Sequence, residues 1–307
     1  YYQSYIYDNN LALGMLYKIE NGNLVAVQQK KSEATIQQIL ALFPDAEKEF
    51  RDSVETWARL LEAPAPDFLR VGLDIEVASA VATRVPDPQK ADDPVVCVAL
   101  VGSDNEKQLF VLKRQGIAMG SKVLPCDTKV MYFDDEKVLL EKLFEALRDY
   151  PFILTFNGDD FDLPYLYNRA KNHFYFQRNQ IPIEMGRRTC SFTHGVHIDL
   201  YKFFFNRSIQ IYAFGNKYRD MTLNAIGTAL LDLPKIEFTN PIAELSYSEL
   251  EEYNLRDSEI TLQLTSFNDN LVMKLILAMS KIARMPMEDV TRQGVSRLSL
   301  IHISEPT

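Results

Sequence analysis

Cysteine is scarce in this chain of 307 residues, and its 3 cysteines, Cys97, Cys126 and Cys190, are scattered without any Cys-x-x-Cys spacing. Such a set argues against a disulfide framework and against a zinc site, so we expect reduced, structural thiols in a cytoplasm. The sequence also lacks an apolar run long enough to cross a membrane, and no charged and then apolar leader follows Tyr1. We therefore expect no membrane partner, no secretion, and an N-terminus that is an internal cut.

An excess of basic residues is missing too, since the formal net charge is −9. This charge argues against a general duplex-DNA binder, because such proteins usually carry a basic face. It is compatible with a nuclease whose site holds acidic metal ligands and whose grip on DNA comes from a neighbouring domain. Apolar residues make up 47% of the chain and aromatic residues 11%, which is enough for one large or two ordinary domains with a sizeable core.

A Pro-Ala-Pro break at residues 64–66 divides the sequence. Before it, residues 13–19 and 24–27 are expected to form strands around an Asn-Gly turn, and the apolar spacing of residues 46–61 predicts one helix. Residues 1–67 are therefore predicted to form a partial, mainly β domain.

The sequence after the break alternates between strand and helix patterns. Short apolar runs predict strands at residues 71–77, 95–101, 108–112, 130–133 and 152–156. A helix is expected from Asp134 to Tyr150, and residues 81–94 are expected to form a polar loop. Three consecutive strands followed by alternating helix and strand predict an α/β domain with a mixed sheet.

The stretch from Val71 to Val77 carries the first chemical signal. A strand here puts Asp74 and Glu76 on the same face, because successive side chains alternate. Two carboxylates this close repel each other, and a fold retains them when a cation lies between them. Hard oxygen ligands suit Mg²⁺ or Mn²⁺. Since Asp-x-Glu is common by chance, the other ligands must come from elsewhere in the chain.

The second signal is the run Asn-Gly-Asp-Asp-Phe-Asp, which begins at Asn157. A strand is expected to end there and a helix to start near Asp162, and ligands gather at such points in open α/β sheets. Asp162 suits a helix N-cap, a site residue, or both at once. Asp159 and Asp160 are expected to be exposed turn residues.

The third signal lies on a late helix, which is expected to begin with a Ser/Glu capping box near residue 246 and to run to about residue 278. Tyr253 and Asp257 are four residues apart and so share one face of this helix. The pair is typical either of a site or of a buried tyrosine beside a satisfied acid.

Two further groups of polar residues are expected to be structural. His197 and Asp199 could be mistaken for a metal pair, but no other His or Cys cluster in the sequence supports that interpretation. Arg178, Arg187 and Arg188 form a modest basic loop, which is more typical of a solvated face than of a phosphate-binding site.

The three signals occur in a fixed order: Asp-x-Glu on a strand, Asn-x3-Phe-Asp at a turn, and Tyr-x3-Asp on a helix. This order resembles the three exonuclease motifs of the proofreading domain of family B DNA polymerases, and the archaeal branch in particular. The runs TFNGDDFDLPYL and YNLRDSEIT carry most of the resemblance. The run from Tyr1 to Asp8 is similar to the start of the N-terminal domain of these polymerases, and the resemblance covers roughly residues 1–298.

The resemblance implies a ribonuclease-H-like fold, with a mixed central sheet flanked by helices, for a 3′→5′ exonuclease domain at residues 68–270. Residues 1–67 correspond to part of the polymerase N-terminal domain, and residues 271–298 to a helical segment returning towards it. Residues 299–307 do not resemble what should follow, so we expect a truncated reading frame with a non-native tail.

The resemblance also implies a metal centre with two divalent ions, Mg²⁺ or Mn²⁺. By motif position, Asp74, Glu76 and Asp257 hold the first ion. Asp74 also reaches the second ion, which Asp162 supports through water. Two dications about 3.5–4 Å apart suit hydrolysis of an anionic phosphodiester, because one activates water and the other stabilises the leaving oxygen.

Tyr253 takes the place of the residue that orients the attacking water. A sister class has His five residues before the last Asp, but Glu252 stands at that position here, so the chain resembles the tyrosine class. A tyrosine hydroxyl, with a reference pKa of about 10, offers positioning more than base strength. Asn157 and Phe161 are expected to contact the DNA.

The resemblance implies DNA as the partner, either as a single-stranded 3′ end or as a primer-template whose mismatched end frays into the site. The palm, fingers and thumb of the polymerase are expected in the same protein, and a sliding clamp would bind through that full-length protein. We expect a prokaryotic protein of the cytoplasm, associated with the nucleoid. No segment matches the acidic polymerisation motifs, so we expect no DNA synthesis by this chain alone.

Two other functions stay open on the residues alone. Some family B relatives keep the fold after losing catalytic acids, so a catalytically idle nucleic-acid-binding or scaffold module is one alternative. The intact set of four acids and Tyr253 favours the enzyme. A free-standing ribonuclease or repair nuclease is the other alternative, and the N-terminal flanking residues argue against it.

Overall fold

The computed structural model describes residues 5–6, 8–9, 11–27, 30–45, 47–62, 65–79, 85–236 and 240–293. It separates two compact units: a smaller one of residues 1–67 and 272–307, and a larger one of residues 68–271. The expected non-native tail, 299–307, lies outside the described residues, as does most of the run from Tyr1 to Asp8. All three motifs fall in the larger unit.

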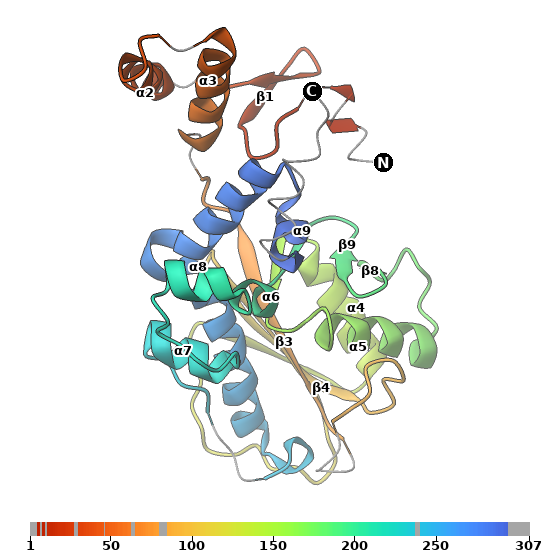
Figure 1. Cartoon of the computed structure of the whole chain (residues 1–307). Helices are drawn as coiled ribbons and strands as arrows, with labels where there is room; N and C mark the ends of the chain where they lie inside the picture. The colour runs from red at the N-terminus through yellow and green to blue at the C-terminus, as the bar shows by residue number, and fades with distance from the viewer. Residues whose placement is uncertain are drawn as a thin grey trace. The chain divides into compact units, whose positions relative to one another are not determined.

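The larger unit is built on a six-stranded sheet with the order β10-β7-β3-β4-β5-β6 (Figure 1). The strands are β3 (Arg70–Val77), β4 (Val95–Gly102), β5 (Lys107–Leu112), β6 (Thr128–Phe133), β7 (Phe152–Thr155) and β10 (Val196–Asp199). Strand β4 is antiparallel to both of its neighbours, whereas the β10–β7, β7–β3 and β5–β6 pairs are parallel. This mixed sheet, flanked by helices, confirms the predicted α/β fold.

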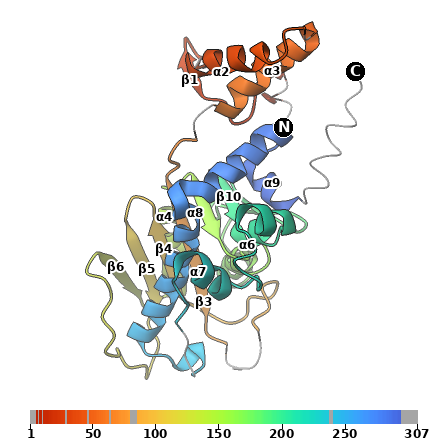
Figure 2. The same ribbon diagram turned by 60° about the vertical axis from the view of Figure 1, so that its left-hand side comes forward.

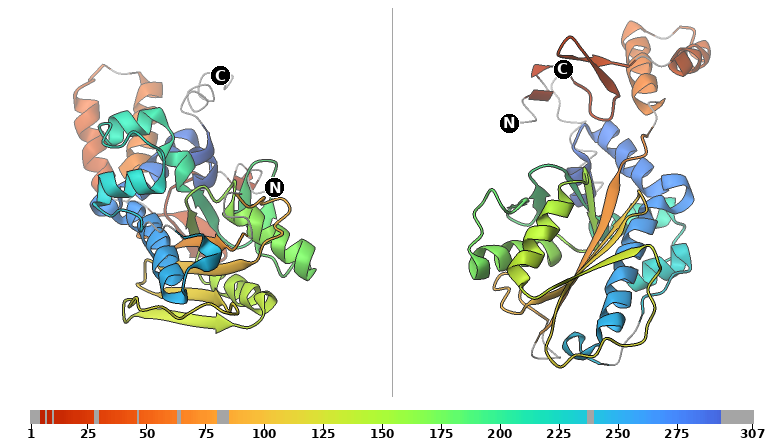
Figure 3. Two further views of the ribbon diagram at one scale, coloured as in Figure 1. Left: turned by 90° about the horizontal axis from the view of Figure 1, so that it is seen from below. Right: turned by 180° about the vertical axis from the view of Figure 1, so that it is seen from behind.

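One face of the sheet carries the apolar core of the unit. Val71, Leu73 and Ile75 of β3 are buried in one cluster with residues of α4 (Glu136–Leu147) and α5 (Asp162–Asn168). Figure 3 shows these helices on one side of the sheet. Because strand side chains alternate, the residues between them in β3 are directed to the opposite face.

That opposite face is covered by the part of α8 (Tyr247–Ala283) that belongs to the larger unit, up to Leu271, and this part runs along the sheet in Figures 1 and 2. The approach is close at Gly72, where an added Cβ would lie 2.5 Å from the Ser258 carbonyl oxygen. Glycine therefore permits α8 to lie against β3. Asp74 and Glu76 follow Gly72 on the same face of the strand, so they are presented to this helix.

Shorter elements complete the larger unit. They are η1 (Arg169–His173), β8 (Ile183–Met185), β9 (Cys190–Phe192), α6 (Leu200–Phe204), η2 (Ile209–Ala213), α7 (Leu223–Leu231) and η3 (Ile242–Glu244). Strands β8 and β9 form an antiparallel hairpin. Helix α7 begins at an N-cap, where the Thr222 hydroxyl accepts from the Ala225 amide, and ends at Asp232 in the left-handed conformation.

Helix α8 is interrupted near the end of the larger unit. Phe267 departs from helical geometry, and residues 268–270 have φ between 47° and 58°, so the helix consists of two parts. The buried guanidinium of Arg70 lies at this break: Nε donates to the Thr265 hydroxyl at 2.9 Å, and Nη2 donates to Asn270 Oδ1 at 2.8 Å. Its Nη1 donates to the Phe68 carbonyl at 2.9 Å. Arg70 thereby ties the start of β3 to the break in α8.

The smaller unit contains the hairpin of β1 (Tyr17–Glu20) and β2 (Asn23–Ala26), then α2 (Lys30–Ala41), α3 (Lys48–Glu62) and, later in the chain, α9 (Met287–Arg292). The hairpin lies where two strands were predicted, but β1 begins at Tyr17, so residues 13–16 of the first predicted strand are outside it. Among the described residues before position 67, however, there are two helices where one was expected, and they exceed the strands in length. The signal for α2 was an apolar stripe that includes Ile36, which is buried.

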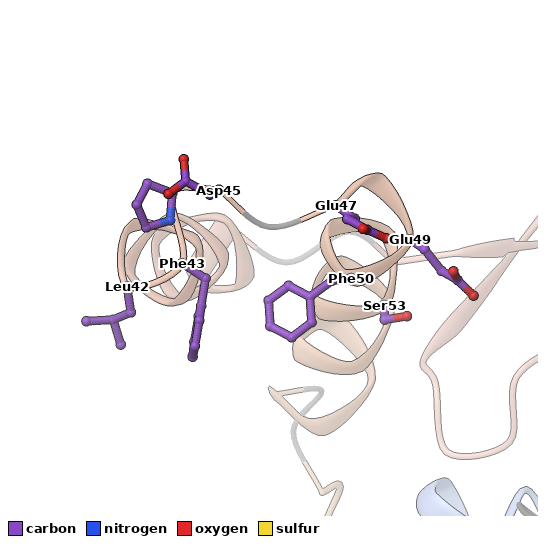
Figure 4. A pocket seen from close by; sticks show the side chains of 8 residues that line it. Leu42, Phe43, Asp45, Glu47, Glu49, Phe50 and Ser53 are labelled. Atoms are coloured by element: carbon purple, nitrogen blue, oxygen red, sulfur yellow. The ribbon is translucent and has the colours of Figure 1, made fainter.

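A groove of about 760 Å³ opens beside the link between α2 and α3 (Figure 4). Phe43 and Phe50 line it with their ring centroids 5.3 Å apart, and both side chains are exposed. The rings therefore contact each other without reaching the closed packing found in the larger unit.

Candidate metal centre

The carboxylates of Asp74, Glu76 and Asp257 meet on the α8 face of the sheet, and that of Asp162 lies beside them; we call the four the acid quartet. Asp74 and Glu76 come from β3, Asp257 from α8, and Asp162 from the start of α5. Single ligand oxygens of Asp74, Glu76 and Asp257 all lie within 4.8 Å of one another. Asp162 stands beside this trio, because its Oδ1 accepts from the amide of Ile75 at 3.3 Å.

The turn before α5 determines where Asp162 is placed. Asn157 adopts the left-handed conformation, with φ of 71°, which asparagine tolerates better than most residues. The N-cap position of α5 is Phe161, and Asp162 is the first helical residue. The expected N-cap role of Asp162 is therefore not observed, and its carboxylate is directed to β3 instead.

The pKa values of all four carboxyl groups in the acid quartet are raised above their ordinary values. Burial, followed by the charges of Asp257 and Glu76, raises the pKa of Asp74 well above its ordinary value. Burial and then Asp257 raise the pKa of Glu76 to about 8, and burial raises the pKa of Asp162 to about 7. Burial also raises the pKa of Asp257. These raised pKa values mean that the carboxylates lack the water or the positive charges that would stabilise their ionised form.

Lys235, in the segment after α7, supplies one positive charge to the quartet. Its ammonium group forms an ion pair with Asp257 Oδ2 and lies 5.5 Å from the centre of the Tyr253 ring. Burial alone would lower the pKa of Lys235, but Asp257 and then Asp74 raise it overall. One ammonium group cannot balance four carboxylates, so the cluster keeps an excess of negative charge.

Tyr253 and Asp257 share one face of α8, as their spacing predicted. Tyr253 is half-buried, and its environment, chiefly burial and then the charge of Glu76, raises the pKa of its hydroxyl above the ordinary value. The hydroxyl therefore stays protonated at neutral pH and acts as a hydrogen-bond donor rather than as a base. Asp257 belongs to the acid quartet, and Tyr253 borders it.

Sequence reasoning missed Asn254, which is fully buried beside Tyr253. Its Nδ2 donates to Oδ2 of Asp74 at 2.7 Å. The available signal was its position three residues before Asp257, which puts both on one helical face. Lys235 was also missed, because a lone lysine in a loop gives no local signal.

The two residues expected to contact DNA lie at the turn before α5. Asn157 is half-buried, and its backbone amide donates to Asp199 Oδ1 at 2.8 Å. Phe161 is half-buried as well and packs against the apolar core, with its ring 5.6 Å from that of Tyr165. Part of the Phe161 ring therefore serves packing.

A second pair of acids, Asp159 and Asp199, lies on the far side of this turn, and we call them the amide-bound acids. Asp199 accepts from the amides of Asn157, Asp159 and Tyr201 at 2.8, 3.2 and 3.0 Å. Asp159 Oδ1 accepts from the Cys190 amide at 2.7 Å. The expectation that Asp159 is an exposed turn residue was wrong, because only 4% of it is exposed.

The neighbours of these acids agree with the other expectations. Asp160 is exposed and pairs with Lys202. His197 is buried, with Nε2 2.8 Å from the Thr155 hydroxyl and Nδ1 2.9 Å from the Cys190 carbonyl. The structural interpretation of His197 and Asp199 is therefore supported by their contacts. The arginines of the basic loop, at positions 178, 187 and 188, are exposed.

The donor set of the acid quartet fits a divalent cation. Its atoms are carboxylate oxygens, the ligands that Mg²⁺ and Mn²⁺ prefer. Asp257 Oδ1 is buried and has no hydrogen-bond partner among the described residues, and such an atom is costly unless something binds it. The raised pKa values indicate the same unmet demand for positive charge.

The chain is similar to known proteins over most of its length. Residues 1–218 match the family model for the exonuclease domain of DNA polymerase family B. The chain is 44% identical over 297 residues to DNA polymerase 1 of Sulfolobus acidocaldarius, a match that covers 96% of the chain and 34% of that protein. It is 43% identical over 297 residues to DNA polymerase 1 of Saccharolobus solfataricus, covering 96% of the chain and 33% of that protein.

A further relative, DNA polymerase 1 of Aeropyrum pernix, is 37% identical over 296 residues, which cover 96% of the chain and 31% of that protein. The chain thus spans about a third of the length of the curated relatives it matches. Among the described residues, no helix combines the length and apolar character needed to span a membrane.

Proposed function

The chain belongs to DNA polymerase family B, whose exonuclease domain it carries, and on this premise we propose that it removes nucleotides from the 3′ end of single-stranded or frayed DNA. The reaction is hydrolysis of the terminal phosphodiester, dependent on divalent metal ions, and it serves proofreading. The observation that carries the proposal is the acid quartet: three acids whose oxygens lie within 4.8 Å of one another, a fourth acid that accepts from the Ile75 amide, and raised pKa values throughout.

In this proposal the acid quartet binds the metal ions. Asp74, Glu76 and Asp257 are the first ligands, because their oxygens already lie within 4.8 Å of one another. We assign Asp162, whose Oδ1 accepts from the Ile75 amide, to the second ion. Two bound Mg²⁺ or Mn²⁺ ions supply the activation of water and the neutralisation of charge on the phosphodiester.

Two other side chains complete the proposed site. The protonated hydroxyl of Tyr253 positions the attacking water by hydrogen bonding, which needs no change in its protonation. Lys235 neutralises Asp257 and offers an ammonium group for the charge that develops on the phosphoryl oxygens. Asn157 and Phe161 flank the turn that presents Asp162, and we assign them to contacts with the DNA strand.

The proposed partners are DNA and the polymerisation part of the same protein, since the relatives are about three times as long as this chain. A palm, fingers and thumb in that part would synthesise the strand that this site edits, and a sliding clamp would bind through the full-length protein.

The test uses one oligonucleotide labelled at either its 5′ or its 3′ end, incubated with the purified chain. With Mg²⁺ or Mn²⁺, we expect 5′-labelled single-stranded DNA to shorten stepwise and 3′-labelled DNA to release labelled mononucleotide. Excess EDTA should abolish both. Degradation from the 5′ end would overturn the proposal, and binding without cleavage would favour an idle nucleic-acid-binding module.

A further inference from the structure

Asn254 combines three properties that packing alone does not require. It is 0% exposed, it lies in the interior of α8, and its Nδ2 donates to Asp74 Oδ2 at 2.7 Å. Asparagine is a weak helix former, so an apolar residue of the same size would serve a buried helical position better. The compensating gain must come from the contact with Asp74.

The oxygen of the Asn254 side-chain amide supports the same conclusion about Asp74. Asn254 Oδ1 is buried and has no hydrogen-bond partner among the described residues, and an acceptor left in this state is costly. Turning the amide over would bring this oxygen against the carboxylate oxygen of Asp74, which is worse. The orientation with nitrogen towards Asp74 is thus fixed by the acid itself.

We propose that Asn254 is a positioning residue for the metal centre, which holds Asp74 Oδ2 so that the remaining oxygen of this carboxylate faces the metal ions. The proposal rests on the proposed function. A neutral donor suits this task because it fixes the rotation of the carboxylate without cancelling its charge. A lysine or arginine at position 254 would compete with the cation instead.

The proposal concerns metal affinity more than the chemical step. Residues that orient a metal ligand typically contribute 10–100-fold to metal affinity or activity. Asn254→Leu keeps the approximate shape of the side chain and removes the donor. We expect it to weaken Mn²⁺ binding by about 10–100-fold while excess Mn²⁺ restores most of the cleavage rate.

Ser258 offers a matched control one turn further along α8. It is also fully buried, but its hydroxyl donates to the Ala99 carbonyl of β4 at 3.0 Å rather than to an acid. Ser258→Ala should lower the melting temperature without changing the affinity for Mn²⁺. The pair of variants separates a contribution to the fold from a contribution to the metal centre.

The experiment measures Mn²⁺ binding by calorimetry, the melting temperature, and cleavage of single-stranded DNA as a function of Mn²⁺ concentration, for the wild-type chain and both variants. Native Mn²⁺ affinity in Asn254→Leu would overturn the inference while leaving the proposed function intact. A wild-type chain that neither binds Mn²⁺ nor cleaves DNA would instead overturn the proposed function. If Asn254→Leu does not fold, Asn254→Ser replaces it, with weaker Mn²⁺ binding expected and native affinity counting against the proposal.

Discussion

The acid quartet, in which Asp74 and Glu76 are half-buried and Asp162 and Asp257 are buried, contrasts with the buried amide-bound acids in its hydrogen bonds. Asp199 accepts hydrogen bonds from three backbone amides and Asp159 from one, and the pKa of Asp199 rises only to about 6. In the quartet, the pKa of Glu76 rises to about 8, and Asp257 Oδ1 has no hydrogen-bond partner among the described residues. Buried acids with enough donors stabilise a fold, whereas buried acids short of donors indicate a place for a ligand.

The largest expected effect comes from Asp74, which belongs to the donor-poor group. Asp74→Asn should reduce cleavage of single-stranded DNA by about 10⁴-fold or more, because a metal ligand is lost. The melting temperature in EDTA should stay level or rise, since the variant replaces a carboxyl group whose ionisation is unfavourable at this site by a neutral amide. Asp160→Asn, at an exposed acid, is the control and should keep its activity. A large loss of stability in Asp74→Asn would break the comparison.

Tyr253→Phe should have the next largest effect. The variant keeps the ring and loses only the hydroxyl, so cleavage should fall by about 10²-fold with Mn²⁺ affinity unchanged. Single-turnover rates and calorimetry on the same preparation measure the two effects. The control is Tyr218→Phe, which removes a buried hydroxyl bonded to the Phe204 carbonyl and should affect stability alone. Weaker metal binding in Tyr253→Phe would assign the residue to the metal instead of the water.

The third prediction concerns pH, because the raised pKa values in the quartet have a defined sign. The folded chain keeps protons on Glu76 and Asp162 that the unfolded chain releases near their ordinary pKa values. Without metal, the free energy of unfolding should therefore fall as the pH rises from about 4.5 to about 8.

Metal binding should respond in the opposite direction, because the ligands must lose their protons first. Mn²⁺ affinity is expected to rise by about tenfold or more between pH 6 and pH 8. Urea unfolding in EDTA and calorimetry at both pH values measure the two trends. Greater stability at pH 8 than at pH 6 in EDTA would show that the quartet is already satisfied.

The smallest effect on cleavage is expected for Asp199→Asn, in the donor-rich group. The variant replaces one accepting oxygen by an NH₂ group that faces backbone amides, so the free energy of unfolding should fall by about 1–3 kcal/mol. Cleavage should fall only about threefold at a temperature where the variant is folded, through loosening of the turn that presents Asp162. A loss of activity as great as that of Asp74→Asn would show that the amide-bound acids and the acid quartet do not differ in their importance for cleavage.

The sequence predicted much of the sheet, because the relevant signals are local. The eight residues of β4 are all buried, as its continuous apolar run indicated, and the alternation in β3 placed Asp74 and Glu76 on one face. The spacing of Tyr253 and Asp257 likewise determined that they share one side of α8. Periodicity alone supports each of these conclusions.

The rest of the site depends on contacts between distant parts of the chain. The buried carboxylate of Asp159 accepts a hydrogen bond from the backbone amide of Cys190, which is 31 residues away, and no local sequence pattern predicts such a partner. Lys235 and Asn254 become site residues only when the segment after α7 and helix α8 lie against β3. Polar residues at these positions are equally typical of a solvated surface until the fold is known.

Arg70 has a consequence for how the larger unit is joined to the rest of the protein. Its side chain bonds both to Phe68, the first residue of that unit, and to Asn270, next to its last, so the chain enters and leaves at one point. A domain whose two ends lie close together can be inserted into a loop of another protein, because the two sides of that loop need to separate only a short distance. Arg70 therefore holds the two ends of the larger unit beside each other.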